Sequence, residues 1–358
     1  EGVYGSAVQR LRDRDSIITA EGIIFRVYGY DHPPKAYICD VEYAPSSVYI
    51  STDPRALRDG GREKYYKFYA DEGLKFVRKN YPKYSVYYEP LGTSLVGVKE
   101  KDIHRMVKPE LKFRELISEE SKDVLTKALK SIFDEVSVGT GLSISDFGVF
   151  GSLLHGFYNP RYSDIDLIVY GRKELNKLRS FLEDSYESGG VLENEFDSPT
   201  AVSGKTWRFR NYSLREYLKH QRRKLIYAVY MDRESGRRIK VEFEPVKRWD
   251  EIGSYYEAGA KVRRVGWIKA LARITDDSDS PFIPSIYGIE VEKILEGERS
   301  ADIIRIMSYV EEFRMQAFKD ELVYVEGNLE EVLSPRGRFH QITLTYCDRY
   351  YDQALKVI

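Results

Sequence analysis

Two aspartates separated by one residue, Asp164 and Asp166, lie in the stretch Ser163–Tyr170, whose apolar end is typical of a β-strand. Side chains two residues apart on a strand point to the same face, so the two carboxylates come close together. Like charges at that distance repel and raise one pKa unless a cation lies between them. Hard oxygen ligands suit Mg²⁺ (or Mn²⁺), which binds carboxylates together with substrate phosphates. The pair therefore predicts a divalent-metal site.

A glycine and a serine, Gly151-Ser152, follow the short apolar strand Asp146–Phe150 and precede a stretch compatible with a helix. Glycine lets the backbone approach a ligand closely, and the N–H groups at a helix start suit a phosphate, as does the Ser152 hydroxyl. Eleven residues separate Ser152 from Asp164. The two motifs together predict a bound triphosphate beside a metal, an arrangement that neutralises charge during an in-line displacement.

This combination resembles the DNA polymerase β-like nucleotidyltransferase superfamily, whose signature is an apolar strand, Gly-Ser, a short connection and Asp-x-Asp in a second apolar strand. The resemblance covers residues 145–250. It implies that Gly151 and Ser152 hold phosphates and that Asp164 and Asp166 bind metal. It also implies transfer of a nucleoside monophosphate from an NTP to an acceptor hydroxyl, with release of pyrophosphate. The whole chain is similar to uncharacterised archaeal proteins that are predicted nucleotidyltransferases.

The resemblance further implies a third carboxylate, on a later strand, that binds metal and helps to activate the attacking hydroxyl. Glu242 and Glu244 share one face of the predicted strand Arg238–Val246. Glu242 is preferred because apolar residues flank it, and Glu244 is the alternative. The family more often has aspartate here, and the extra methylene of glutamate shifts the oxygens relative to the metal. Lys240 lies on the same face and is a candidate to bind the nucleotide.

Other functions remain open for these motifs. Asp-x-Asp alone is also found on exposed acidic strands, and Gly-Ser alone in ordinary turns. Some glycosyltransferases use Asp-x-Asp to hold a metal and a nucleotide sugar, but the Gly-Ser turn has no role there. A catalytically inactive RNA-binding protein that retains the nucleotidyltransferase fold is the main alternative.

A basic stretch, residues 204–248, holds fourteen Lys or Arg and five Asp or Glu, a local balance of +9. Phosphate binding needs such charge, and the interleaved aromatics Trp207, Phe209 and Tyr212 can stack on bases. This favours an RNA end as the acceptor, although a bound NTP also needs cations. The alternative is a solvated helix face that the acidic stretch 183–197 partly balances.

The composition is that of ordinary globular domains, with 42% hydrophobic residues and a net charge of -1. A chain of 358 residues exceeds what one core usually holds, so two or three domains are expected. Two distant cysteines and five scattered histidines argue against a disulfide scaffold and a zinc pattern, and fit a reducing cytoplasm. No apolar run reaches the roughly 18–20 residues of a membrane span, so no membrane partner is expected. The oligomeric state is left open.

The expected fold is α+β and multi-domain. Residues 1–110 are predicted to form an N-terminal α+β domain of unknown role, and residues 111–254 a nucleotidyltransferase domain with a mixed sheet and helices. Residues 255–358 are predicted to form a small β-barrel-like domain, either for nucleic acid or as a plain interaction module. The elements expected to frame the site are helices over Lys64–Lys79, Ser118–Val138, Arg172–Leu182 and Tyr212–Lys224, and a hairpin turn at Glu326-Gly327-Asn328.

Overall fold

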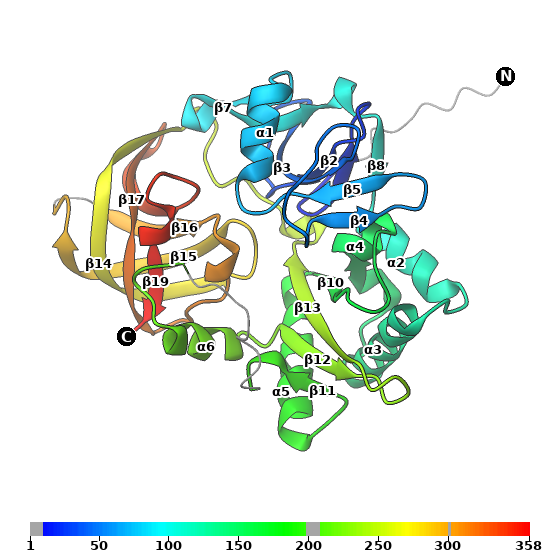
Figure 1. The fold of residues 1–358 in the computed structure, drawn as a ribbon. Coiled ribbons are helices and arrows are strands. Elements are labelled where there is room, and N and C mark those ends of the chain that lie inside the picture. Colours follow the sequence, from blue (N-terminus) through cyan, green and yellow to red (C-terminus); the bar gives the residue numbers. More distant parts are fainter. Residues whose placement is uncertain (1–9, 198–207, 300–301) are drawn as a thin grey trace.

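The computed structural model describes residues 10–197, 208–299 and 302–358. Within these ranges the strands form three sheets, accompanied by six α-helices. Figure 1 shows the three sheets as separate groups of elements, with strand β13 of the middle group directed towards the N-terminal sheet. The predicted α+β class is confirmed, whereas the bounds of the three domains stay a prediction.

The N-terminal sheet is antiparallel, in the order β4-β5-β3-β2-β1-β8, and β7 joins β3 to β6. Helix α1 (Glu72–Asn80) packs closely on β3, because a Cβ added at Gly73 would lie 2.6 Å from the Val41 Cβ. The strands are β1 (Ser16–Ile18), β2 (Ile24–Val27), β3 (Ala36–Pro45), β4 (Leu57–Asp59), β5 (Lys64–Lys67), β6 (Ser85–Tyr88), β7 (Thr93–Lys99) and β8 (Arg105–Val107).

The middle sheet has the order β11-β12-β13-β10-β9, and its two central strands, β10 and β13, run parallel. Alternate side chains of β10 and β13, such as Leu167 and Phe243, belong to the hydrophobic core that also contains residues of helices α3 and α5. The acidic positions therefore fall on the opposite face. The strands are β9 (Phe147–Val149), β10 (Ile165–Tyr170), β11 (Leu192–Asn194), β12 (Tyr227–Met231) and β13 (Arg238–Val246); the helices are α2 (Pro109–Ser118), α3 (Val124–Thr140), α4 (Gly151–His155), α5 (Arg172–Ser188) and α6 (Leu214–Arg222).

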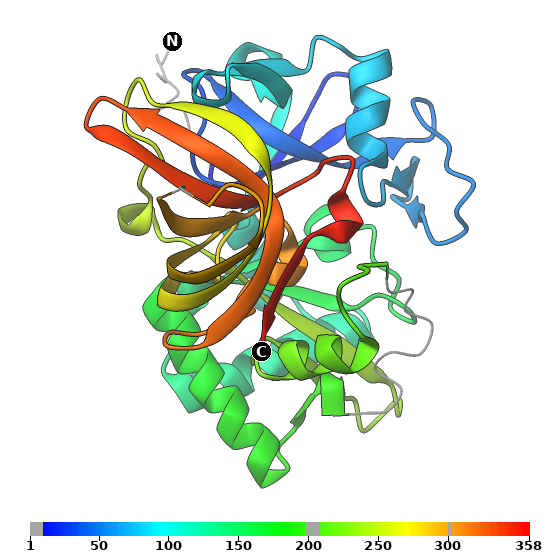
Figure 2. The same ribbon diagram turned by 90° about the vertical axis from the view of Figure 1, so that its left-hand side faces the viewer.

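The third sheet follows in the order β14-β15-β16-β18-β17-β19, and β14 also pairs with β17. The pairings of β14, β15, β16, β18 and β17 therefore form a closed circuit, and Figure 2 shows these long strands curving around one another. Such a circuit is what a barrel requires, while the barrel itself stays a prediction. The strands are β14 (Lys261–Asp279), β15 (Ser285–Glu296), β16 (Ile303–Ser308), β17 (Leu322–Ser334), β18 (Gly337–Leu344) and β19 (Ala354–Val357).

The predicted helix Ser118–Val138 begins at the wrong residue. Ser118 ends α2, and α3 begins only after Asp123, whose carboxylate accepts hydrogen bonds from the backbone N–H groups of Leu125 and Thr126. Aspartate caps a helix start as well as serine does, and here it also completes a capping box with Thr126. At the other end Gly141, with φ of 71°, ends the helix.

The predicted helix Lys64–Lys79 is wrong over its first part. Lys64–Lys67 form strand β5, and α1 begins only at Glu72. The tyrosines and lysines of this segment pair with β3 and β4 instead of forming a helical face, because sheet context overrides weak local propensity. This correction places Lys67 on a strand beside β3.

The predicted hairpin turn at Glu326-Gly327-Asn328 is also wrong, because these residues lie inside the continuous strand β17. Gly327 pairs with Ile268 of β14, and an added Cβ would lie 2.4 Å from the Leu344 Cδ2. The glycine is therefore explained by close packing within the strand and not by a turn.

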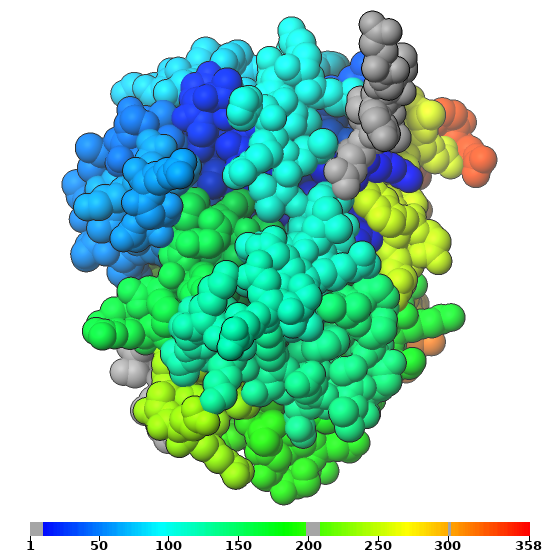
Figure 3. Space-filling view, turned by 90° about the vertical axis from the view of Figure 1, so that its right-hand side faces the viewer, coloured from blue at the N-terminus to red at the C-terminus, as the bar shows by residue number. Residues whose placement is uncertain are grey.

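The surface seen in Figure 3 is dominated by the segment that carries α2 and α3, which runs between the N-terminal sheet and the middle domain. Within the described ranges, the structure contains no helix long and apolar enough to cross a membrane.

We expect Gly327→Ala to lower the free energy of unfolding by about 1–3 kcal/mol, because the new methyl group overpacks against Leu344. Gly266→Ala on the neighbouring strand is the matched control, since its Cβ meets nothing within 4 Å, and we expect it to change stability by less than about 0.5 kcal/mol. Urea unfolding of both variants measures the difference. Equal effects would contradict the packing explanation.

Candidate functional site

The acidic residues of the candidate site meet at the centre of the middle sheet. Asp166 on β10 lies directly opposite Glu242 on β13 in a parallel register. Partners in such a register place their side chains on the same face. Asp164 comes just before β10 and is exposed, and both Asp166 and Glu242 are partly exposed. The structure therefore places Asp166 beside Glu242, the predicted third carboxylate, with Asp164 two residues before Asp166.

The Gly-Ser turn lies directly against the same carboxylates. Gly151 has φ of 62°, and a Cβ added there would lie 2.3 Å from the Asp166 Oδ2. The Phe150 backbone N–H also donates to the Asp166 carbonyl oxygen at 2.9 Å. Only glycine allows both this backbone conformation and this approach. Ser152 follows on helix α4 and is partly exposed.

The two candidate glutamates of β13 differ in what surrounds them. The Glu244 Oε2 lies 2.6 Å from the Arg14 Nη2 and 2.5 Å from the Arg314 Nη1, and each arginine side chain is only 1% exposed. Glu242 forms an ion pair with Arg314 at 3.1 Å, and its side chain keeps 34% of its surface exposed. Glu244 is thus held inside a buried ion-pair cluster, and Glu242 is the glutamate that a ligand can reach.

The carboxylates are held together at an electrostatic cost. Burial, together with the charges of Glu244 and Asp164, raises the pKa of Asp166 to about 6, and the charges of Lys67 and Arg14 limit this rise. Burial, followed by the neighbouring Glu244, also raises the pKa of Glu242 well above its ordinary value. A bound cation relieves this kind of crowding by favouring the ionised forms.

The donor chemistry fits a divalent cation that arrives with its substrate. Over the described part of the chain, no three Asp, Glu, His or Cys side chains stand together as a complete metal-binding group. Mg²⁺ commonly takes only one or two protein carboxylates and completes its shell with water and substrate phosphates. Asp166 and Glu242, with the exposed Asp164 beside them, offer the hard oxygen atoms that such a partial site needs.

Comparison with known proteins assigns the middle of the chain to a family. Residues 126–245 match the family model of the nucleotidyltransferase domain. This chain contains a nucleotidyltransferase domain. The match includes the Gly-Ser turn, both aspartates and both glutamates of β13, so the resemblance that the motifs suggest is confirmed for this segment.

The similarity to one relative extends beyond the nucleotidyltransferase domain. The chain is 24% identical over 351 residues to the uncharacterized protein MJ1086 of Methanocaldococcus jannaschii, an alignment that covers 97% of this chain and 99% of that protein. No solved structure matches the chain significantly. The sheets on either side of the nucleotidyltransferase domain therefore have to be interpreted from their own residues.

Lys240, the predicted nucleotide-binding cation, is engaged by another residue. It lies on β13 two residues before Glu242, and its Nζ is 2.7 Å from the Glu195 Oε1. Arg238 pairs similarly with Glu193 at 2.8 Å. Lys240 remains a predicted ligand of the nucleotide, but it must leave this ion pair, or share it, in order to bind a phosphate.

Much of the charge in the basic stretch is neutralised by its neighbours. Arg222 pairs with Asp197 at 2.6 Å, and Lys224 is fully buried with its ammonium on the Glu312 carbonyl oxygen. Phe209 and Tyr212 pack into the core of the third sheet, so their rings are not available for stacking on bases. Trp207 lies outside the described residues. These contacts weaken the argument for an RNA surface on this stretch.

The N-terminal sheet packs against α4 of the nucleotidyltransferase domain, a contact that the sequence did not predict. The Tyr43 ring lies 5.7 Å from that of His155 and 5.5 Å from that of Phe157. Burial lowers the pKa of His155 to about 3, so this histidine is neutral and structural at ordinary pH. Residues of three separate parts of the chain therefore surround the site: Arg14 from the segment before β1, Lys67 from β5 and Arg314 from the segment after β16. These three carry no local motif in the sequence.

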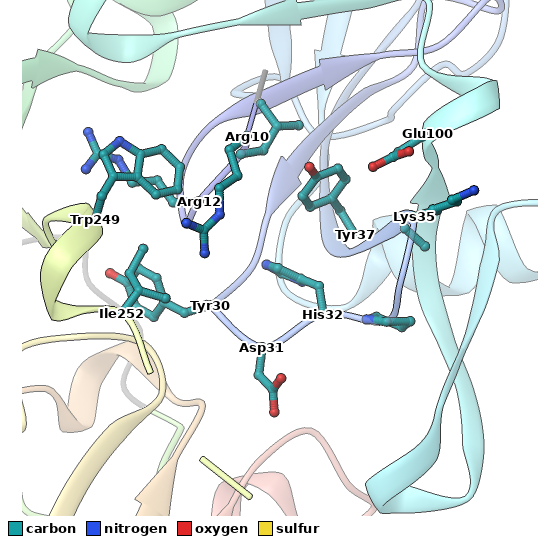
Figure 4. Close-up of a pocket in the computed structure, with 13 residues that line it drawn as sticks. Arg10, Arg12, Tyr30, Asp31, His32, Lys35, Tyr37, Glu100, Trp249 and Ile252 are labelled. Carbon is teal, nitrogen blue, oxygen red and sulfur yellow. The ribbon is translucent and has the colours of Figure 1, made fainter. Parts of the chain in front are cut away.

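A separate hollow lies away from the candidate residues. It has a volume of about 230 Å³, and the lining residues labelled in Figure 4 include Arg12, His32, Tyr37 and Trp249. Arg12 is already committed there, because its guanidinium lies 3.8 Å from the centre of the Tyr170 ring and donates to a backbone carbonyl. Small-molecule sites usually occupy at least about 300 Å³. None of the candidate residues lines this hollow.

We expect Glu244→Gln to destabilise the protein by about 3 kcal/mol, because it removes a carboxylate that two buried guanidinium groups share and leaves Arg14 to pair with Glu311 and Arg314 to pair with Glu242. Glu242→Gln on the same strand removes only one contact of a partly exposed group, and we expect a loss below about 1 kcal/mol. Urea unfolding tests the contrast. If Glu242→Gln were the more damaging change, the assignment of the buried cluster to Glu244 would be wrong.

The raised pKa of Asp166 predicts a pH-dependent effect of Asp166→Asn on stability. Below pH of about 4 the carboxyl is protonated in both the folded and the unfolded chain, so the variant gains nothing. Between pH of about 4 and 6 the unfolded chain ionises while the folded Asp166 keeps its proton, so the wild-type protein loses stability until the pH has passed about 6, and asparagine avoids that loss. Thermal unfolding across this range should show the variant becoming the more stable protein.

Asp134→Asn, at an exposed position of α3, is the control for removing a surface carboxylate. We expect its melting temperature to follow that of the wild type at each pH. A constant difference between Asp166→Asn and wild type across the range would contradict the crowding described for Asp166.

Proposed function

We propose that this protein transfers a nucleoside monophosphate from an NTP to an acceptor hydroxyl in the presence of Mg²⁺ (or Mn²⁺), with release of pyrophosphate. The observation that carries the proposal is the contact between the Gly151 backbone and the Asp166 carboxylate, next to Glu242 on the parallel strand. It places a turn that can hold phosphates against carboxylates that can hold a cation. The match to the nucleotidyltransferase domain family supports the same reaction class.

In this proposal each residue has a separate task. Gly151 and Ser152 hold the phosphates, and Asp164, Asp166 and Glu242 hold the cation. The bound cation supplies charge neutralisation to the triphosphate. The acceptor oxygen forms a bond to the α-phosphorus while the bond between that phosphorus and pyrophosphate breaks. In its ionised form Glu242 accepts the hydroxyl proton, and a bound cation would favour this form against the burial and the neighbouring Glu244 that raise its pKa.

The acceptor that we favour is an RNA end. The excess of basic residues over residues 204–248 supports it, although several of these cations form ion pairs within the protein. We further propose that residues 1–110, 111–254 and 255–358 are three domains. In the last of them, the closed circuit of strand pairings would form the small barrel that contacts the nucleic acid.

The proposal is tested by incubating the pure protein with each α-phosphate-labelled NTP, Mg²⁺ or Mn²⁺, and a pool of small RNAs. We expect label on RNA, or on the protein itself, with the wild type and none with the Asp164→Ala/Asp166→Ala double variant. The exposed variant Asp134→Asn should label as the wild type does. Transfer that survives the double substitution would show that the site is assigned wrongly.

The alternative is a catalytically inactive RNA-binding protein that retains the nucleotidyltransferase fold. The absence of a complete metal-binding group among the described acidic side chains is the observation that favours it. It predicts salt-dependent RNA binding without incorporation of label under any metal. Such binding should also persist in the Asp164→Ala/Asp166→Ala variant.

A further inference from the structure

The N-terminal sheet is fixed to the Gly-Ser turn of the nucleotidyltransferase domain through aromatic packing. Tyr65 of β5 stacks on Phe157 with ring centres 4.5 Å apart, and Tyr43 of β3 meets the same ring edge-on at 5.5 Å. Phe157 comes two residues after the end of α4, and its backbone N–H donates to the Ser152 carbonyl oxygen at 2.9 Å. Strands β3 and β5 are therefore held in a defined position beside Gly151 and Ser152.

This packing directs one lysine of the N-terminal sheet towards the candidate site. Lys67 lies on β5 directly opposite Tyr43 of β3. Its charge interacts with the Tyr43 phenol, with Glu42 and with Asp166, and these three together raise its pKa. Lys67 in turn acts on Asp166, where its charge opposes the rise of the carboxyl pKa. Because residues directly opposite each other in a sheet share a face, the Lys67 side chain lies on the face whose Tyr43 ring packs against His155 and Phe157, beside the Gly-Ser turn.

The other cations close to this carboxylate cluster are already paired. Arg14 and Arg314 bind Glu244 at 2.6 and 2.5 Å, and Lys240 binds Glu195 at 2.7 Å. Lys67 differs from them. Among the described residues, no carboxylate oxygen lies within 4.0 Å of its ammonium nitrogen, the distance that defines an ion pair. It is partly buried, so its charge is only partly screened by water. A partly buried lysine that lacks such a contact is suited to a ligand anion.

We infer that Lys67 binds the triphosphate of the nucleotide, so that the N-terminal sheet forms one wall of the nucleotide site. This inference rests on the proposed function, because it takes an NTP held at Gly151 and Ser152 as the ligand. Lysine binds phosphate as a point charge, and a charge-assisted hydrogen bond is stronger than a neutral one. A triphosphate carries more charge than a monophosphate, so Lys67 favours NTP over NMP.

The experiment measures equilibrium binding of the four NTPs and the four matching NMPs to the full-length chain in Mn²⁺, by titration calorimetry. We expect Lys67→Met to weaken NTP binding by about tenfold or more, the contribution of a hydrogen bond to a charged group, and to change NMP binding much less. Lys67→Arg should restore most of the affinity for NTP. Lys64→Met, an exposed lysine on the same strand, should bind as the wild type does.

Two further measurements separate binding from structure. Thermal unfolding shows whether Lys67→Met is folded, and Lys67→Arg serves as the folded reference if it is not. Binding of Mn²⁺ alone reports on Asp166 without nucleotide. If Lys67 only offsets the charge of Asp166, Lys67→Met will change the affinity for Mn²⁺ and will weaken NMP binding as much as NTP binding. This result would overturn the inference.

The outcomes also distinguish this inference from the proposed function. In one outcome the wild type binds NTP, Asp164→Ala/Asp166→Ala loses that binding, and Lys67→Met keeps it. The role of Lys67 is then wrong, and the proposed function stands. If the wild type binds no NTP in any metal, both are overturned. If Lys240→Met loses NTP selectively while Lys67→Met does not, the cation of the site is Lys240 and not Lys67.

Discussion

The arrangement of the molecule depends on one buried carboxylate, that of Glu244. Arg14, from the segment before β1, and Arg314, from the segment after β16, both bind it within 2.6 Å. Burying charges is unfavourable unless each has its partner, so the three groups have to be assembled together. One glutamate of the nucleotidyltransferase domain therefore joins this domain to both of the other sheets. Arg314 also reaches Glu242, so the contact extends to the candidate site itself.

The candidate site shows the opposite kind of electrostatics on the same strands. Glu244 is paired with two cations. Asp166 and Glu242, in contrast, are buried next to other carboxylates, and this raises their pKa values. Groups with perturbed pKa values cluster at functional sites, although ion-pair networks also perturb them. Here the two situations lie next to each other on β13, and they distinguish the enclosed Glu244 from Glu242, the candidate site residue. The neighbouring ion-pair cluster holds the crowded acids in place.

Local features of the chain were readable from the sequence, and distant ones were not. Gly151-Ser152, Asp164 and Asp166 stand in short motifs, and the alternation of β13 distinguished its two faces. The preference for Glu242 over Glu244 rested on its apolar neighbours, and the structure adds a reason, because Glu244 is enclosed by arginines. Arg14 and Arg314 come from remote segments, so no local pattern announces their meeting.

Two errors show how tertiary contacts override local signals. Lys67 was expected on a helix over Lys64–Lys79, but pairing with β3 makes it a strand residue. Gly327 was expected in a turn, but it lies inside a strand. A glycine is needed there because Leu344 occupies the space that a side chain would fill. In both cases the decisive partner lies outside the window that a local pattern can cover.

The shared carboxylate of Glu244 also restricts how the molecule can move. Any hinge motion that swings the N-terminal sheet away from the nucleotidyltransferase domain separates Arg14 from Glu244, and the same holds for the third sheet and Arg314. Breaking one buried pair of this kind costs about 3–5 kcal/mol, so an open form is populated at roughly 1% or less. Ligand exchange is then expected through side-chain and loop fluctuations around a rigid frame. We therefore expect the three sheets to stay together in nearly all molecules, so that a ligand reaches the candidate site without a domain-scale opening.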